Sequence, residues 1–173
     1  MNLHAVLLLL LVLSLAYIAY QDFRYRSVPV LVFGISFLLA IAVQYQACGM
    51  DQLFMIQISL NSLFIVLNLL IVIVYIKQIK KIPLSSALGI GDIVFYLILI
   101  PLLSIPVFMY FHISSLLLIL TLYPILKNTM SFHTRAIPLA GLQACYLIIL
   151  LIVFEYIYVL KPIVGSCSLV YWI

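Results

Sequence analysis

Apolar residues occur along the chain in six long runs, and short polar segments separate most of them. A transmembrane helix needs about 20 mostly apolar residues, and runs near that length span residues 3–20, 28–47, 53–76, 89–104, 107–126 and 137–160. The pattern predicts an all-α fold, a polytopic membrane bundle of about six transmembrane helices.

The fourth and fifth runs have no charged loop between them. One helix over residues 89–126 would be about 57 Å long at 1.5 Å per residue, whereas a bilayer core is about 30 Å thick. Pro101 and Pro106 interrupt the helical hydrogen-bond ladder in this stretch. We therefore expect a tight reversal between Leu102 and His112.

Composition agrees with a membrane location. Hydrophobic residues make up 68% of the chain and charged residues 7%, whereas about a quarter of the residues in soluble domains are charged. We expect a single transmembrane domain over residues 1–173, with the lipid bilayer as a partner. The net charge of +4 is explained by basic loops, so we expect no nucleic-acid partner.

The basic residues occupy alternate loops. Cytoplasmic loops of membrane proteins are enriched in Lys and Arg. The pattern thus predicts a cytoplasmic-membrane protein whose first, third and fifth loops are inside and whose termini are both outside. We read the N-terminal run as a retained span, since it lacks a basic start and a convincing cleavage site. The residues that set this pattern are Arg24, Arg26, Lys77, Lys80, Lys81, Lys127 and Arg135, with Lys161 in the tail.

Neither cysteines nor histidines have the spacing of a metal site. We expect no metal and no cofactor, and we expect each histidine at the membrane interface. Cys48 and Cys167 fall on the same predicted side, which leaves their pairing open. The residues concerned are Cys48, Cys145, Cys167, His4, His112 and His133.

The chain has four acidic residues, and two of them are predicted at the cytoplasmic ends of helices. Asp51 is expected in a solvated outer turn and Glu155 near the outer end of the last span. Asp22 ends the first span, and Asp92 begins the fourth. We therefore expect Asp22 and Asp92 to meet at one depth on the cytoplasmic side.

Two carboxyl groups in one poorly solvated site share a single proton. Such a pair suits peptide hydrolysis, because the ionised member activates water while the protonated member polarises the scissile carbonyl. Gly89 and Gly91 precede Asp92 and are candidate substrate-binding residues, since glycine lets another backbone come close. The alternative readings are an interfacial salt bridge for Asp22 and a helix cap for Asp92.

Three short motifs resemble the type IV prepilin peptidase family, which includes the archaeal preflagellin peptidases. The first is Asp22-Phe23-Arg24-Tyr25-Arg26-Ser27-Val28-Pro29, similar to an Asp followed by basic residues and Val-Pro. The second is Gly89-Ile90-Gly91-Asp92, the family's GxGD. The third, weaker match is Ile137-Pro138-Leu139-Ala140-Gly141.

The resemblance implies a membrane aspartyl endopeptidase with Asp22 and Asp92 as its catalytic pair. It would cut the short basic leader from prepilin or pseudopilin-like membrane proteins, as in type IV pilus assembly. Val30 and Val94 depart from residues common in the family, Asn and Lys respectively. A paired-CxxC region that accompanies methyl transfer in some members is not found, so we expect peptidase activity only.

A non-enzymatic function is the alternative: a small polytopic channel, a transporter subunit or a membrane scaffold. Transporters are expected to show polar residues near the bilayer midplane or broken helices in two halves. Ser59, Asn61 and Asn68 in the third span are the candidates for such polar residues. We expect them to form hydrogen bonds between helices instead.

Overall fold

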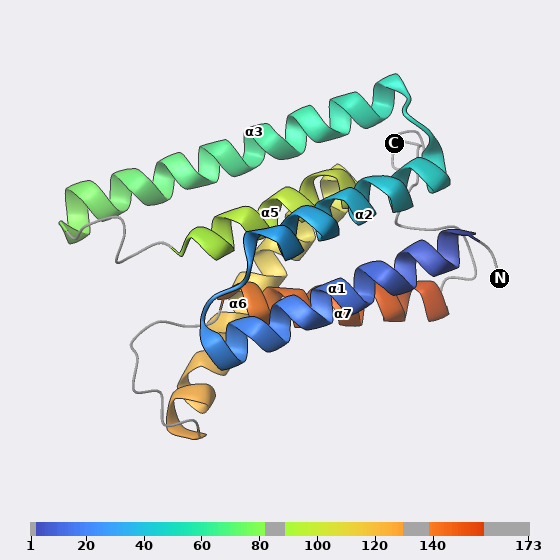
Figure 1. The fold of residues 1–173 in the computed structure, drawn as a ribbon. Coiled ribbons are helices and arrows are strands. Elements are labelled where there is room, and N and C mark those ends of the chain that lie inside the picture. Colours follow the sequence, from blue (N-terminus) through green and yellow to red (C-terminus); the bar gives the residue numbers. More distant parts are fainter. Residues whose placement is uncertain (1–2, 82–88, 130–138, 158–173) are drawn as a thin grey trace.

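A computed structural model describes residues 3–81, 89–129 and 139–157. Within these ranges the structure is helical and contains no strand, which confirms the predicted all-α fold (Figure 1). The elements are α1 (Leu3–Tyr25), α2 (Val30–Cys48), α3 (Gln52–Tyr75), the short π-helix η1 (Ile76–Lys80), α5 (Ile90–Leu102), α6 (Ile105–Thr129) and α7 (Leu139–Ile157).

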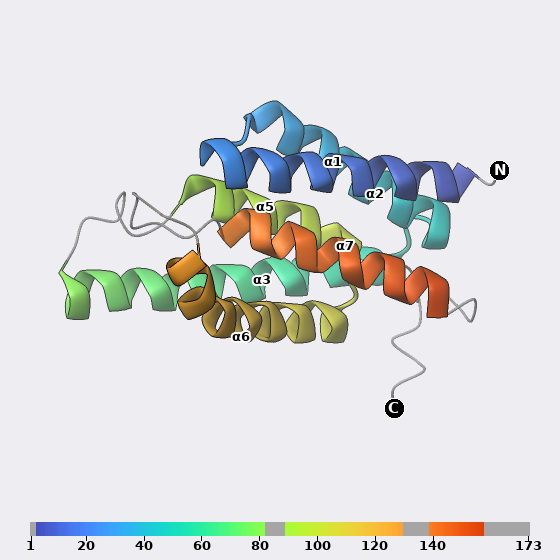
Figure 2. The ribbon, with the colours of Figure 1, turned by 90° about the horizontal axis from the view of Figure 1, so that it is seen from below.

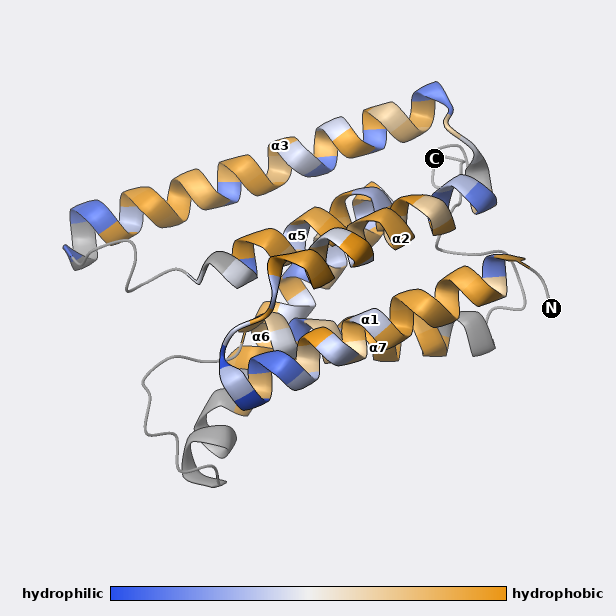
Figure 3. Cartoon of the chain, in the orientation of Figure 1, coloured by the Kyte–Doolittle hydropathy of each residue, from blue (hydrophilic) through white to orange (hydrophobic). Residues whose placement is uncertain are grey.

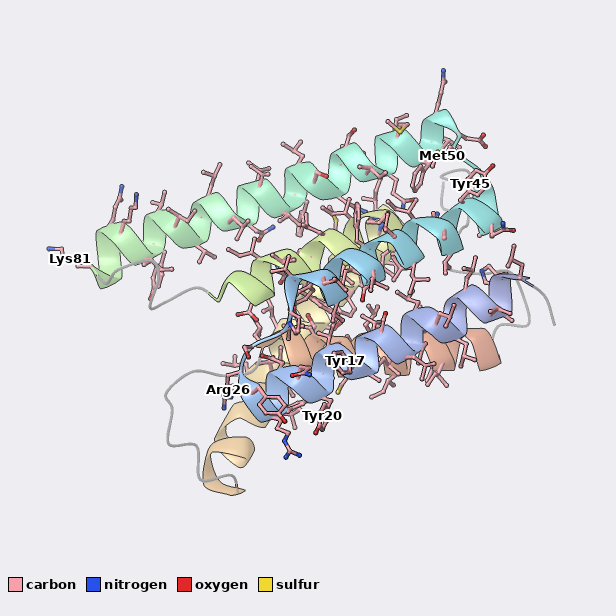
Figure 4. The ribbon with its side chains drawn as sticks, viewed as in Figure 1. Tyr17, Tyr20, Arg26, Tyr45, Met50 and Lys81 are labelled. Atoms are coloured by element: carbon pink, nitrogen blue, oxygen red, sulfur yellow. The ribbon has the colours of Figure 1, made fainter. Side chains whose placement is uncertain are left out.

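Successive helices run in opposite directions along the bundle, as the two views show (Figures 1 and 2). The first loop and the end of η1 therefore lie at the same end of the molecule. Figure 4 shows Arg26 and Lys81 at this end, and Tyr45 and Met50 at the other. We call it the basic end, defined by Arg24, Arg26, Lys77, Lys80 and Lys81.

The exterior of the bundle is apolar, with polar residues concentrated at the two ends (Figure 3). Four helices, α1, α2, α3 and α6, are long and apolar enough to cross a membrane, judged by length and composition. The apolar segments of α5 and α7 are shorter. Many large hydrophobic side chains point outward, as expected for a chain whose solvent is lipid, including Leu13, Leu38, Leu63, Ile71 and Leu120.

The reversal between α5 and α6 lies inside the predicted window. Helix α5 ends at Leu102 and α6 begins at Ile105, so Leu103 and Ser104 make the turn. Helix α5 has 13 residues, which is about 20 Å at 1.5 Å per residue and less than the thickness of a bilayer core.

Helix α5 lies inside the bundle, in contact with α2, α3 and α7. Helix α1 packs along both α2 and α7, whereas α3 packs on α5 and α6. Most side chains of α5 therefore belong to the core, together with side chains from the helices around it. The largest fully buried side chains include Leu15, Phe95, Leu99, Phe111 and Leu147.

Polar side chains tie the helices together at a few positions. Asn61 on α3 donates to the carbonyl oxygens of Ile100 (3.0 Å) and Leu103 (2.9 Å) at the end of α5. This confirms the expected interhelical role of Asn61. The same expectation was wrong for Ser59 and Asn68, which donate to carbonyls one turn back in α3 itself; such bonds let a polar side chain face lipid or a neighbour without an external partner.

Candidate active site

Asp22 lies in the last turn of α1, at the basic end. The helix ends just beyond it, because Arg26 takes a left-handed conformation with φ of 55°. The N–H of Arg26 donates to the carbonyl oxygen of Asp22 at 3.1 Å, a common way of closing a helix. The Asp22 side chain is partly buried, and it faces α7.

Asp92 lies in the first turn of α5, at the same end. Gly89 is the N-cap of this helix, and its carbonyl accepts a hydrogen bond from the N–H of Asp92 at 3.2 Å. The Asp92 side chain reaches α7. The alternative reading of Asp92 as a cap of its own helix stays a prediction.

Both carboxylates bind the N-terminus of α7. The N–H of Ala140 donates to Oδ1 of Asp92 at 2.9 Å, and the N–H of Gly141 donates to Oδ2 of Asp22 at 2.6 Å. The first four N–H groups of a helix have no partner within the helix, and its N-terminus carries partial positive charge. The start of α7 thus holds two acidic groups side by side on consecutive amides.

The two carboxyl groups are close enough for the charge of Asp22 to act on Asp92. Arg26 acts electrostatically on Asp22. Arg24 contacts aromatic side chains instead: its guanidinium lies over the rings of Tyr20 (5.9 Å) and Tyr25 (5.5 Å). The structure brings together the two predicted acids at the start of α7.

Gly141 lets α1 and α7 approach each other closely. A Cβ at this position would lie 3.0 Å from Oδ2 and 3.2 Å from Cβ of Asp22, and 3.4 Å from the carbonyl oxygen of Ala19. A side chain here would therefore push Asp22 or the backbone of α1 away. Sequence reasoning gave Ala140 and Gly141 no role in the site; their only signal was the motif at residues 137–141.

The two predicted substrate-binding glycines have different surroundings. A Cβ at Gly89 would lie 2.8 Å from Oδ2 of Asp92, whereas a Cβ at Gly91 would meet only Cζ of Phe33, at an ordinary 3.9 Å. Among the described residues, no other backbone approaches either glycine. Gly89 is exposed, and the lack of a side chain there leaves room for Oδ2 of Asp92. Their role in substrate binding stays a prediction.

A buried polar cluster lies farther inside the bundle, next to the carboxylates. It consists of Tyr96 on α5, His112 and Ser115 on α6, and Gln143 on α7. The ring of His112, which is partly buried, packs between helices against Tyr96 and Phe64, and its expected place at the membrane interface stays a prediction. Sequence reasoning missed this cluster; an uncharged Gln in an otherwise apolar run was the available signal.

The remaining predicted positions lie away from the carboxylates. Asp51 is exposed at the start of α3, as expected of a residue in a solvated turn. Glu155 lies near the end of α7, far along the helix from Ala140. The side chain of Cys48 and the whole of Cys167 and His133 lie outside the described residues, so the Cys48–Cys167 pairing stays open.

Metal ligation was tested for the described part of the chain, and no group of three His, Cys, Asp or Glu side chains there could hold a metal ion. Comparison with protein-family models, curated proteins and solved structures returns no match. The family resemblance of the three motifs therefore stays a prediction.

Proposed function

We propose that this chain is a membrane aspartyl endopeptidase of the prepilin peptidase type, with Asp22 and Asp92 as its catalytic pair. The observation that carries the proposal is the attachment of both carboxylates to consecutive amides at the start of α7. In a chain with only four acidic residues, two of them share one helix end within an apolar bundle.

In the proposed reaction each carboxyl group uses the oxygen that does not bind α7. Gly141 binds Oδ2 of Asp22 and Ala140 binds Oδ1 of Asp92. Oδ1 of Asp22 and Oδ2 of Asp92 are then the oxygens proposed to meet water and substrate. In the proposed reaction the ionised carboxylate takes a proton from a water molecule as that water attacks the peptide carbonyl. The protonated partner donates a hydrogen bond to the carbonyl oxygen and then protonates the leaving amine.

The N-terminus of α7 supports this reaction electrostatically. Its partial positive charge and its amide donors stabilise negative charge at the pair, which offsets the cost of placing carboxylates in an apolar bundle. The donors are backbone groups, so their positions depend on helix α7 and not on any particular side chain.

The proposed substrate is a membrane protein with a short basic leader before its hydrophobic helix, that is, a prepilin or pseudopilin. The carboxylates lie at the basic end of the bundle, and Asp22 is close to Arg24 and Arg26 in sequence. Because basic loops favour the cytoplasmic side, the proposed cleavage takes place at the cytoplasmic face of the cytoplasmic membrane.

Leader removal from a panel of prepilin-like substrates tests the proposal. The chain and each substrate are coexpressed, and the loss of the leader is followed by gel shift. Wild type is expected to cleave at least one substrate, and Asp22→Asn and Asp92→Asn are each expected to abolish cleavage. Asp51→Asn is the matched control, because Asp51 is exposed at the opposite end and its change should leave cleavage intact.

Two results would contradict the proposal in different ways. Cleavage by both Asn variants at the wild-type rate would exclude the carboxyl pair as the catalytic group. A well-folded wild-type protein that cuts no member of the panel would favour the channel, transporter or scaffold alternative.

A further inference from the structure

Three helices contribute polar groups to one place in the bundle interior. The side-chain amide of Gln143 donates to the hydroxyl of Tyr96 at 3.2 Å and approaches Oγ of Ser115 at 3.5 Å. The His112 ring lies beside the Tyr96 ring, with centroids 5.4 Å apart. Oγ of Ser115 donates to the carbonyl oxygen of His112 at 3.1 Å, so these two residues share one face of α6.

Two polar atoms of this cluster have hydrogen-bonding capacity that the protein does not use. Oε1 of Gln143 and Nδ1 of His112 are buried and have no hydrogen-bond partner among the described residues. The Gln143 side chain is 0% exposed. Buried polar atoms in native proteins almost always have a partner, and bound water supplies that partner where the protein does not.

The cluster lies directly behind the carboxyl pair. Tyr96 follows Asp92 by one helical turn on α5, and the charge of Asp92 acts on Tyr96. Gln143 lies in the same turn of α7 as Ala140 and Gly141, the residues whose amides bind the carboxylates. Water held here would be one turn from the two acids.

We propose that Tyr96, His112, Ser115 and Gln143 form a hydration site inside the bundle, adjacent to the carboxyl pair. The unused atoms suit water, because Oε1 of Gln143 accepts a hydrogen bond and the Tyr96 hydroxyl, which accepts one from Gln143, keeps its own hydrogen to donate. A water molecule needs two to four such partners to be held in a protein interior.

The site has a consequence for catalysis, which rests on the proposed function. Hydrolysis consumes one water molecule per cut, and the lipid-facing surface of this bundle is apolar. Water stored beside the acids would supply the nucleophile while a substrate segment covers the exposed side of the pair near Gly89.

Hydroxyl-radical footprinting in the absence of substrate tests the hydration site itself. Radiolysis turns bound water into radicals that modify the side chains beside it. We expect Tyr96 and His112 to be modified several times faster than Phe95, which is 0% exposed and belongs to the apolar core. Modification of Tyr96 no faster than that of Phe95 would overturn the proposal, whatever the activity of the protein.

Gln143→Met removes the amide while nearly keeping the volume of the side chain. It is expected to bring the modification of Tyr96 down to the level of Phe95. Gln44→Met is the matched control: Gln44 is also buried, at 3% exposed, and its Oε1 also has no partner, but it lies next to Tyr45 at the opposite end (Figure 4). If the modification of Tyr96 is unchanged in Gln143→Met, Gln143 is not part of the hydration site.

Cleavage kinetics then test the supply of water. Gln143→Met is expected to lower kcat on the order of tenfold, the low end of what misplacing a reacting group costs, with KM unchanged. Gln44→Met should keep the wild-type kcat. If Gln143→Met loses the labelling but keeps kcat, the water-supply role is wrong. If Asp22→Asn and Asp92→Asn lose cleavage while Gln143→Met keeps a normal kcat, the proposed function is supported and the water-supply role is wrong.

Discussion

Side chains from neighbouring helices cap two helix ends in this bundle. Carboxylates cap the start of α7, and side-chain amides cap the end of α5. At the basic end, Asp22 and Asp92 accept hydrogen bonds from the first N–H groups of α7. At the opposite end, Gln57 and Asn61 of α3 donate to the last carbonyl groups of α5. Both arrangements meet the same need, because a helix end in an apolar environment has no water to satisfy its free backbone groups.

The difference between the two caps is chemical. A neutral amide at the end of α5 satisfies carbonyls and has no proton to transfer. A carboxylate at the start of α7 accepts a hydrogen bond from an amide with one oxygen, and the proposed function gives the other oxygen a part in the reaction. Capping therefore accounts for stability at both ends, whereas only the acidic cap offers groups for general acid and base catalysis.

The largest expected effect on cleavage comes from neutralising both acids together. Asp22→Asn/Asp92→Asn is expected to lose cleavage to the same extent as each single variant, about 10²–10⁴-fold, because the two groups act as one unit. Asn still has an oxygen to accept the α7 amide, so the thermal melting temperature in detergent should change little. A double variant much less active than either single variant would show that the two acids act separately.

Gly141→Ala tests whether close contact between α1 and α7 positions Asp22. The new Cβ would lie 3.0 Å from Oδ2 of Asp22, so the helices must separate slightly. We expect a loss of about 1–3 kcal/mol in the free energy of unfolding from overpacking, and a fall in cleavage of about tenfold to 100-fold from misplacement.

Gly34→Ala is the matched control for Gly141→Ala. Gly34 lies in α2 with nothing within 4 Å of its missing Cβ, and Ala in a helix is more stable than Gly by about 0.5–1 kcal/mol. Its melting temperature should rise slightly and its cleavage stay normal. Equal behaviour of the two Ala variants would exclude a special role for Gly141.

Gly89→Ala is expected to reduce cleavage by a smaller factor than Gly141→Ala. Its Cβ would contact Oδ2 of Asp92, and the carboxylate can turn away at little cost to stability because only the end of a side chain moves. Gly91→Ala, whose Cβ would make an ordinary 3.9 Å contact with Phe33, does not disturb Asp92, so it should lose less cleavage than Gly89→Ala, and any loss would reflect its predicted contact with substrate. Comparison of initial cleavage rates checks both; similar losses in the two variants would contradict this account of Gly89.

Asn61→Leu addresses the amide cap and should leave cleavage unaffected at temperatures where the protein is folded. It leaves the carbonyls of Ile100 and Leu103 without their donor, at a cost of about 1–3 kcal/mol for buried unsatisfied groups. Thermal denaturation in detergent measures the loss. Ser59→Ala is the control, since Ser59 donates only within α3 and is exposed; an equal loss in both would contradict the capping role of Asn61.

Local pattern was enough to predict the helices of this protein. The turn between α5 and α6 lies within the predicted interval, because two prolines and a helix too long for a bilayer required a break there. The same reasoning placed Asp22 and Asp92 at one end of the bundle. It did not reveal the contacts of His112 with Tyr96 and Phe64, since one histidine in an apolar run has no pattern that identifies its neighbours.

Hydrophobic content and charge placement determined that this chain forms apolar helices with the residues of the basic end and two of its acids on one side, because lipid excludes unpaired polar groups from a helix surface. Only the tertiary structure decided that α7 is what joins the two acids. The bond from Gly141 to Asp22 crosses 119 positions of the chain, and its donor is a backbone amide. Every residue type except proline has such an amide, so no sequence pattern marks the ones that a folded bundle places beside a carboxylate.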